Sequence, residues 1–218
     1  MDIPVIPLRI RRNEMISSDI VFNGPSMTMT DDVVNYDDLL SSVKETYGKE
    51  NPVLIIDMKG MQKKDIIPDV LKRTKMKRDF WLMTGVHDQI DLIDAFQGDM
   101  SKVAVPYHFT NDELLKEMVE LSDSCVPSLF VDNGIVHMKG KKRGLRDIIR
   151  TLERMNFRKV IVFDVSESDP LRAWESASDL SDTIIPYVSS GSKNDIDIVH
   201  KLGFNDVLIP AVRSLNIS

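Results

Sequence analysis

The stretch Pro127–Gly140, PSLFVDNGIVHMKG, constrains the fold more than any other part of the sequence. Its first half is an apolar run that ends in one carboxylate, Asp132. The dipeptide Asn133–Gly134 is a tight-turn signal, and a second short apolar run follows it. A buried strand that delivers an acidic residue at its C-terminal end is typical of a (β/α)8 barrel, in which the active site is built from these strand ends.

Short apolar runs of this kind alternate along the chain with segments of helical spacing. The predicted strands are Ile3–Pro7, Pro52–Asp57, Phe80–Thr84, Lys102–Pro106, Ser128–Asp132, Arg158–Asp164, Thr183–Val188 and Asp206–Pro210. They lack the strict alternation of a half-exposed sheet, so we expect them to be parallel and buried on both faces. Eight such units close a barrel, and we predict a compact α/β fold, a (β/α)8 TIM barrel in which residues 1–218 form one domain. An open doubly wound sheet is the alternative, but no glycine-rich turn follows the first strand.

The segments between these runs are mostly predicted to be helical. The predicted helices are Tyr36–Tyr47, Gln62–Lys75, a helix that Asp88 caps and that runs to Gly98, Asp112–Leu121 with Thr110 or Asn111 as its cap, Gly144–Met155, Leu171–Leu180 and Lys193–Leu202. Two segments are exceptions. The basic stretch Leu8–Arg12 is predicted to be irregular, and Ser17–Asp32, with its turn signal Asn23-Gly24-Pro25, is predicted to be a long loop or a small hairpin.

The composition excludes several classes of protein. The net charge of −6 argues against a general nucleic-acid surface and against an anionic membrane as partners. The single cysteine, Cys125, excludes an intramolecular disulfide framework. No apolar run approaches the ~20 residues of a membrane span, and the first residues lack the pattern of a signal peptide. We therefore expect a cytoplasmic protein.

Four motifs follow one another in a distinctive order. They are Ile3–Leu8, Pro52–Gly60 (PVLIIDMKG), Leu129–Gly140 and Ser189–Gly203. In this order the chain resembles the histidine-biosynthesis barrels, and most closely the family of phosphoribosylformimino aminoimidazole carboxamide ribotide (ProFAR) isomerases. The resemblance implies a ribulose-phosphate-binding barrel that needs neither a metal nor a cofactor. It also implies an Amadori rearrangement of an aminoaldose to an aminoketose, on a ribotide with a phosphate group at each end.

The resemblance also suggests which residues carry out the chemistry. An Amadori rearrangement needs an acid to open the ribose ring and a base to remove the C2 proton. The family's acids at the ends of strands five, two and six match Asp132, Asp57 and Asp164, and we predict these three as catalytic. The family's strand-one aspartate falls on Pro7, which can neither give nor take a proton. A strand-end acid also commonly caps the segment that follows it, and this is the alternative role of all three.

The family holds its phosphates with backbone N–H groups in the loops after the strands. The residues predicted to bind phosphate here are Ser189, Ser190, Gly191 and Ser192 after strand seven, Gly85 and His87 after strand three, and Arg9 after strand one. After strands four and eight the expected glycines fall on Pro106 and Pro210, which have no N–H to donate. Prolines that end strands are explained either by strand termination or by closure of an ancestral site.

Two functions follow from these residues. The first is a ProFAR isomerase-like enzyme that acts on a small phosphorylated sugar or ribotide by acid/base catalysis. The second is a catalytically degenerate or repurposed barrel that acts as a binding or interaction protein. An anion held at Ser190–Ser192 favours the first function. A barrel mouth plugged by Phe163, Tyr107 and Tyr187 favours the second.

Overall fold

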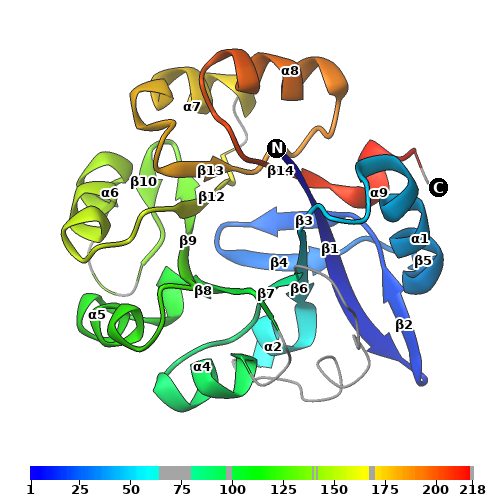
Figure 1. Ribbon diagram of the computed structural model, residues 1–218, viewed down its shortest axis with the longest axis horizontal. Helices are drawn as coiled ribbons and strands as arrows, with labels where there is room; N and C mark the ends of the chain where they lie inside the picture. Colours follow the sequence, from blue (N-terminus) through cyan, green and yellow to red (C-terminus); the bar gives the residue numbers. More distant parts are fainter. Residues whose placement is uncertain (64–79, 97–99, 139, 141, 167–169, 217–218) are drawn as a thin grey trace.

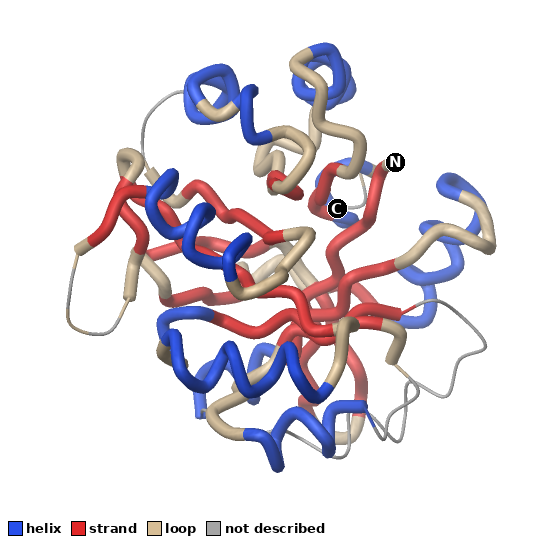
Figure 2. Tube along the Cα trace, turned by 60° about the vertical axis from the view of Figure 1, so that its left-hand side comes forward, coloured by secondary structure: helices blue, strands red, loops and turns tan. Residues whose placement is uncertain are grey.

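The computed structural model describes residues 1–63, 80–96, 100–138, 140, 142–166 and 170–216. In this part of the chain, twelve strands form one mostly parallel sheet and two further strands form a separate hairpin. Helices lie outside the strands around much of the molecule (Figures 1 and 2). The predicted α/β class with a parallel sheet is thereby confirmed. Among the described helices, none combines the length and the apolar character needed to cross a bilayer.

Eight of the described strands run parallel to one another at the predicted positions. They are β1 (Asp2–Arg11), β6 (Val53–Asp57), β7 (Phe80–Met83), β8 (Lys102–Pro106), β9 (Cys125–Asp132), β12 (Val160–Asp164), β13 (Ile184–Pro186) and β14 (Val207–Pro210). From β1 to β13 each pairs with the next in this order, and β14 pairs with the other side of β1. Between β13 and β14 there is one parallel bridge, Tyr187 to Leu208, and the Val188 N–H donates to the Leu208 carbonyl oxygen over 2.9 Å.

The observed helices are α1 (Tyr36–Tyr47), α2 (Met58–Lys63), α4 (Gln89–Phe96), α5 (Asp112–Leu121), α6 (Leu145–Arg154), α7 (Pro170–Ser176), α8 (Lys193–Lys201) and α9 (Ala211–Ser214), with 3₁₀ turns η1 (Tyr107–Phe109) and η2 (Ser178–Leu180). Most agree with the prediction, but α2 begins four residues before the predicted start at Gln62, and the helix predicted over Leu171–Leu180 is divided into α7 and η2. Both predicted caps are confirmed: Asp88 accepts the Asp91 N–H over 2.9 Å, and Asn111 accepts the Leu114 N–H over 2.8 Å. Most of the predicted helix 62–75 lies outside the described residues.

The prediction that Leu8–Arg12 is irregular is wrong. β1 continues to Arg11 and folds back onto β2 (Glu14–Ser17) as an antiparallel ribbon, and β5 (Val34–Asn35) pairs with the other side of β2. Arg12 and Asn13 form the turn with φ values of 50° and 69°, the left-handed geometry that suits two-residue hairpin turns. Alternating burial favours the extension, because Leu8 is buried while Arg9 next to it is exposed.

Two structural turns follow the sequence signals closely. In Pro127–Gly140, Asn133 and Gly134 both take positive φ, and the chain returns from β9 into β10 (Ile135–Val136), which pairs with β11 (Arg143–Gly144). Near the N-terminus, β3 (Ile20–Asn23) and β4 (Ser26–Met29) form the predicted hairpin, with Gly24 at φ 56°. Figure 1 shows this hairpin crossing the middle of the molecule, within the curve of the parallel strands.

The strands separate two hydrophobic clusters, because neighbouring residues of a strand point to opposite faces. The outer cluster joins strand residues such as Val131 and Val162 to helix residues such as Leu115 and Ile148. The inner cluster contains the alternate strand residues and two residues of the β3–β4 hairpin: Ile3, Val5, Leu54, Ile56, Trp81, Met83, Ala104, Phe130, Phe163, Ile185, Leu208, Ile20 and Met27 are among its members. The hairpin therefore packs against the inner face of the sheet, together with Met58 and Met61 of α2.

Candidate functional site

Aromatic rings fill the space between the C-terminal ends of several parallel strands. Phe22 of the hairpin lies 5.8 Å from Phe163, 5.8 Å from Tyr187 and 6.2 Å from Phe130, measured between ring centroids. Phe130 and Phe163 stack on each other at 5.1 Å with an interplanar angle of 12°. Offset-stacked and tilted rings at these separations attract one another in addition to the area they bury. We call these four residues the aromatic plug.

The plug differs from the predicted one by three residues, because Tyr107 does not belong to it and Phe22 and Phe130 were not predicted. Phe163 and Tyr187 belong to it, as expected. Tyr107 instead lies in the outer cluster, and its hydroxyl donates to Asp112 at the start of α5. Phe22 was missed by the sequence analysis, although Ile20 and Phe22 on β3 and Met27 and Met29 on β4 give the hairpin an apolar face. That pattern identifies a buried face but not the surface that the face covers.

An ion pair holds the base of the hairpin in place. Asp19 accepts a hydrogen bond from Arg213 Nε over 3.2 Å, and Arg213 Nη1 donates to the Ser189 carbonyl oxygen over 2.7 Å. The Thr30 N–H donates to the Asp19 carbonyl oxygen over 3.0 Å and closes the hairpin base. One arginine from α9 thereby ties the hairpin to the loop that follows β13.

Asp57 lies apart from the other two predicted catalytic acids. It is only 2% exposed, and it accepts hydrogen bonds from the Gly60 N–H over 2.9 Å and from the Thr84 hydroxyl over 3.1 Å. Asp57 lies on the same face of β6 as Val53 and Ile55, which belong to the outer cluster, so it faces the helical layer. Its bond to Gly60 stabilises the first turn of α2, which is the capping role that the sequence left open.

Asp132 and Asp164 end two neighbouring strands. Asp132 is exposed and accepts the Asn133 side-chain amide over 2.7 Å. Asp164 is partly buried, and its Oδ1 accepts both the Ser166 N–H over 3.1 Å and the Ser166 hydroxyl over 2.7 Å. Burial raises the pKa of Asp164, the Ser166 hydrogen bonds oppose this shift, and the charge of Asp132 adds to it. The two acids thus end adjacent strands, but alternation along the strands places Asp132 on the face of Phe130 and Asp164 on the face of Val162.

The predicted phosphate loop after β13 already holds a carboxylate of the chain itself. Ser192 caps α8 by accepting the Asp195 N–H over 3.2 Å. A hydrogen bond from Ser190 is the main cause that lowers the pKa of Asp195, in the first turn of the same helix. Gly191 has a φ of 63°, and an added Cβ would lie 3.0 Å from Pro210 Cγ. The polar groups and the glycine of this loop therefore have internal structural roles.

The other predicted phosphate-binding residues lie in separate places. Gly85 is buried two residues after the end of β7. The His87 N–H donates to Asp91 over 2.8 Å, and the His87 ring lies 5.0 Å from the Phe109 ring. Arg9 is exposed on the β1–β2 ribbon. Within the described residues, no hydrogen bond or ion pair joins Arg9 or His87 to the loop after β13.

A cavity of about 630 Å³ lies on the other face of β9 and β12, against α6 and α7. Its apolar wall includes Val131 and Val162 of the strands and Trp174 of α7. Its polar lining includes Asp164, Ser166, Arg146 and Arg172. We call it the α6–α7 cavity. The sequence analysis singled out Asp164 but gave no sign of this cavity, because the separation of two helices is not encoded in a local pattern.

A smaller cavity of about 350 Å³ lies beside the hairpin, where Met27, Met61 and His108 are among the lining residues. Within the described residues, no group of three or more histidine, cysteine, aspartate or glutamate side chains has an arrangement that could hold a metal ion. In comparisons with known proteins, no family model matches the chain, and no curated protein is significantly similar to it in sequence. The resemblance to the ProFAR isomerase family therefore stays a prediction.

Proposed function

We propose that the eight parallel strands close into one (β/α)8 barrel of the ribulose-phosphate-binding type, formed by residues 1–218. The support is the continuous series of parallel pairs from β14 through β1 to β13, together with the bridge between Tyr187 and Leu208. In this arrangement the inner cluster is the barrel interior, and the aromatic plug lies at its C-terminal mouth. That mouth is where enzymes with this fold bind their substrates.

We further propose that this barrel is a repurposed relative of the ProFAR isomerases, and that it acts as a binding protein without Amadori activity. The observation that carries this proposal is the packing of Phe22 against Phe130, Phe163 and Tyr187. A ribotide with two phosphates needs a wide polar mouth, and here the corresponding space holds apolar rings. The hairpin is also fixed at its base by the Asp19–Arg213 pair.

The placement of the acids supports the same proposal. A general acid and a general base must both reach one bound substrate. Asp57 is engaged by Gly60 and Thr84 in the helical layer, and Asp164 lines the α6–α7 cavity. The phosphate loop uses Ser190 and Ser192 to hold Asp195. These interactions engage Asp57, Asp164 and the phosphate loop in internal contacts, whereas Asp132 is exposed.

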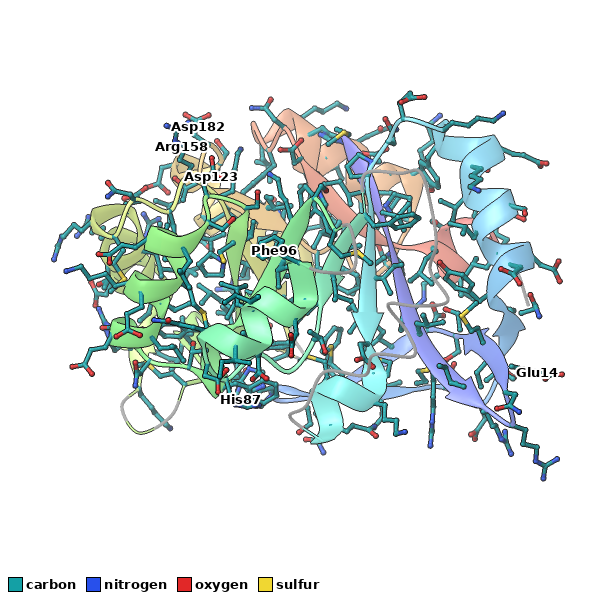
Figure 3. All side chains as sticks on the ribbon, turned by 60° about the horizontal axis from the view of Figure 1, so that its bottom comes forward. Glu14, His87, Phe96, Asp123, Arg158 and Asp182 are labelled. Atoms are coloured by element: carbon teal, nitrogen blue, oxygen red, sulfur yellow. The ribbon has the colours of Figure 1, made fainter. Side chains whose placement is uncertain are left out.

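The test is a calorimetric titration and a turnover assay with the ProFAR ribotide at low salt. We expect no heat at millimolar ligand and no product. Turnover that Asp132→Asn abolishes would overturn the proposal. Asp123→Asn is the matched control, because Asp123 is exposed and lies at the end of the molecule opposite His87, which follows the C-terminal end of β7 (Figure 3).

An isomerase is the second candidate, and one observation favours it. The charge of Asp132 contributes to the raised pKa of Asp164, and the two acids end neighbouring strands. This candidate needs the hairpin to leave the mouth. It predicts that Phe22→Ala increases ribotide binding and that Ser190→Asp then removes it. Equal, undetectable binding by the wild-type chain and by Phe22→Ala would exclude this candidate.

A further inference from the structure

The α6–α7 cavity lies on the face of β9 and β12 opposite the aromatic plug. Val131 and Val162 line the cavity, whereas their neighbours Phe130 and Phe163 belong to the plug. The backbone of these two strands therefore separates the cavity from the barrel interior. A volume of about 630 Å³ is within the range of small-molecule sites. A ligand in this cavity would have no access to the barrel mouth and would not require the hairpin to move.

Two side chains of opposite charge in this lining can form further hydrogen bonds or ion pairs. Asp164 uses Oδ1 for both Ser166 hydrogen bonds, and no described residue donates to its Oδ2. Arg172 forms no ion pair with any described residue. The other arginine of the lining, Arg146, differs in this respect, because it forms two hydrogen bonds to Asp179 of 2.5 and 2.9 Å. The cavity thus presents one available carboxylate, Asp164, and one available guanidinium group, Arg172. Arg146 instead holds α6 against η2.

The rest of the lining determines what kind of molecule fits between these charges. Val131, Val162, Leu145, Ala173, Trp174 and Ala177 provide apolar surface. A partly buried carboxylate is costly without a partner, and a ligand ammonium group at Asp164 would offset that cost. A ligand carboxylate suits Arg172, because guanidinium groups bind carboxylates with paired hydrogen bonds. The complementary ligand is apolar in its body and carries both charges.

We propose that the α6–α7 cavity binds a small zwitterion with an apolar body, of the class of free aromatic or branched-chain amino acids. Its ammonium group would bind Asp164 and its carboxylate would bind Arg172. This inference rests on the proposed binding function and supplies its ligand class. It does not depend on the state of the barrel mouth, since the cavity lies on the other face of the sheet.

The experiment is isothermal titration of the full chain with three probes of matched shape: L-phenylalanine, phenethylamine and 3-phenylpropionate. The two analogues each lack one charged group of the amino acid. We expect L-phenylalanine to bind, and each analogue to bind at least about tenfold more weakly, since one ion pair is missing. The absence of heat with L-phenylalanine and with L-leucine at millimolar concentration would overturn the proposal.

Variants of the two charged residues assign the contacts. Arg172→Gln should weaken the binding of L-phenylalanine and 3-phenylpropionate but leave the binding of phenethylamine unchanged. Asp164→Asn should weaken the binding of L-phenylalanine and phenethylamine but leave the binding of 3-phenylpropionate unchanged. Arg158→Gln is the matched control, because Arg158 is exposed just before the opposite end of β12 (Figure 3). Binding that neither variant changes would place the ligand elsewhere and overturn the proposal.

A third variant tests the cavity itself without touching the charges. Ala173→Leu adds apolar volume to the lining and should abolish binding, while circular dichroism and the melting temperature report whether the fold is kept. If Ala173→Leu does not fold, the two charge variants still decide the question. Turnover of the ProFAR ribotide would overturn the proposed loss of isomerase activity but not this site, so the two failures can be told apart.

Discussion

The two faces of β9 and β12 differ in what covers them. On the inner face, Phe130 and Phe163 stack and are closed over by Phe22 of the hairpin. On the outer face, Val131 and Val162 line a cavity of about 630 Å³ with charged groups in its wall. Strand alternation alone places these neighbours on opposite faces. The comparison teaches that, in the described part of the chain, the cavity beside these two strands lies on their outer face, between the strands and the helices α6 and α7.

The largest loss of stability is expected from a substitution on the inner face. Phe163→Ala removes a side chain that is fully buried and touches three other aromatic rings. We expect the free energy of unfolding to fall by ~3–5 kcal/mol, because a large cavity is left in a packed core. Urea denaturation followed by circular dichroism measures it. Val162→Ala, on the outer face of the same strand, should cost less, and a larger loss for the valine would contradict the comparison.

The next effect concerns the hairpin. Phe22 is partly exposed, so Phe22→Ala should cost less than Phe163→Ala, about 1–3 kcal/mol. The loss should be accompanied by faster hydrogen exchange in the hairpin and unchanged exchange in α6 and α7, because the outer face does not depend on the plug. Hydrogen exchange with mass spectrometry can separate these segments. Equal deprotection of α6 would show that the two faces are coupled.

A smaller effect is expected at the base of the hairpin. Arg213→Gln removes the ion pair to Asp19, and because the arginine side chain is 46% exposed, the free energy of unfolding should fall by only ~0.5–1 kcal/mol. The effect should diminish in high salt, since exposed pairs are screened. Thermal melts of both proteins at low and high salt measure it. A loss that does not depend on salt would assign the role of Arg213 to its hydrogen bond with Ser189 instead.

The smallest effect is a pH dependence at the outer face. The folded-state pKa of Asp164 is raised by burial, so the folded state holds this proton more tightly than the unfolded state does. The resulting stabilisation is present at acid pH and is lost as the pH rises through the folded-state pKa. Asp164→Asn should therefore melt slightly higher than the wild type at neutral pH, and the difference should shrink as the pH falls.

Asp179 provides a control of opposite sign for this pH dependence. Its hydrogen bond with Arg146 lowers its pKa, so its contribution is present above the unfolded-state pKa and is lost on acidification. Asp179→Asn should therefore melt lower than the wild type at neutral pH, and this difference should also shrink in acid. Melting temperatures across the acid range check both variants. Shifts of the same sign in the two variants would contradict the assignment.

Local patterns predicted the positions of the strands well, and the directions of their side chains poorly. All eight predicted strands are present because each is a short apolar run bounded by turn or cap signals. Because these strands are continuous apolar runs, the sequence does not indicate to which face Asp57 and Asp164 point. In a half-exposed strand the polar positions mark the outer face, but a strand that is apolar on both faces offers no such reference. The acids could be placed at strand ends from the sequence, but not on a face.

The aromatic plug could not be predicted for a different reason. The β3–β4 hairpin was one of two structures allowed by the turn signal at Asn23-Gly24-Pro25, and its apolar face can be recognised in retrospect. Its position against Phe130 and Phe163 depends on contacts more than a hundred residues apart in sequence. The continuation of β1 toward Arg11 was missed for a local reason: β1 pairs there with β2 only a few residues later, but the Arg12–Asn13 turn has neither glycine nor proline to signal it.

The tie between Asp19 and Arg213 has a consequence for how the protein is made. Its two residues are separated by 194 positions, and β1 pairs with β14 over a similar span. A chain emerging from the ribosome exposes its N-terminal hairpin long before the partners of that hairpin exist. Contacts of such long range form slowly, because a large loop must close first. Phe22 stays uncovered until the strands that carry Phe130, Phe163 and Tyr187 have been synthesised, and the base of the hairpin is tied only when Arg213 follows. The N-terminal hairpin is therefore the segment that a chaperone would have to protect.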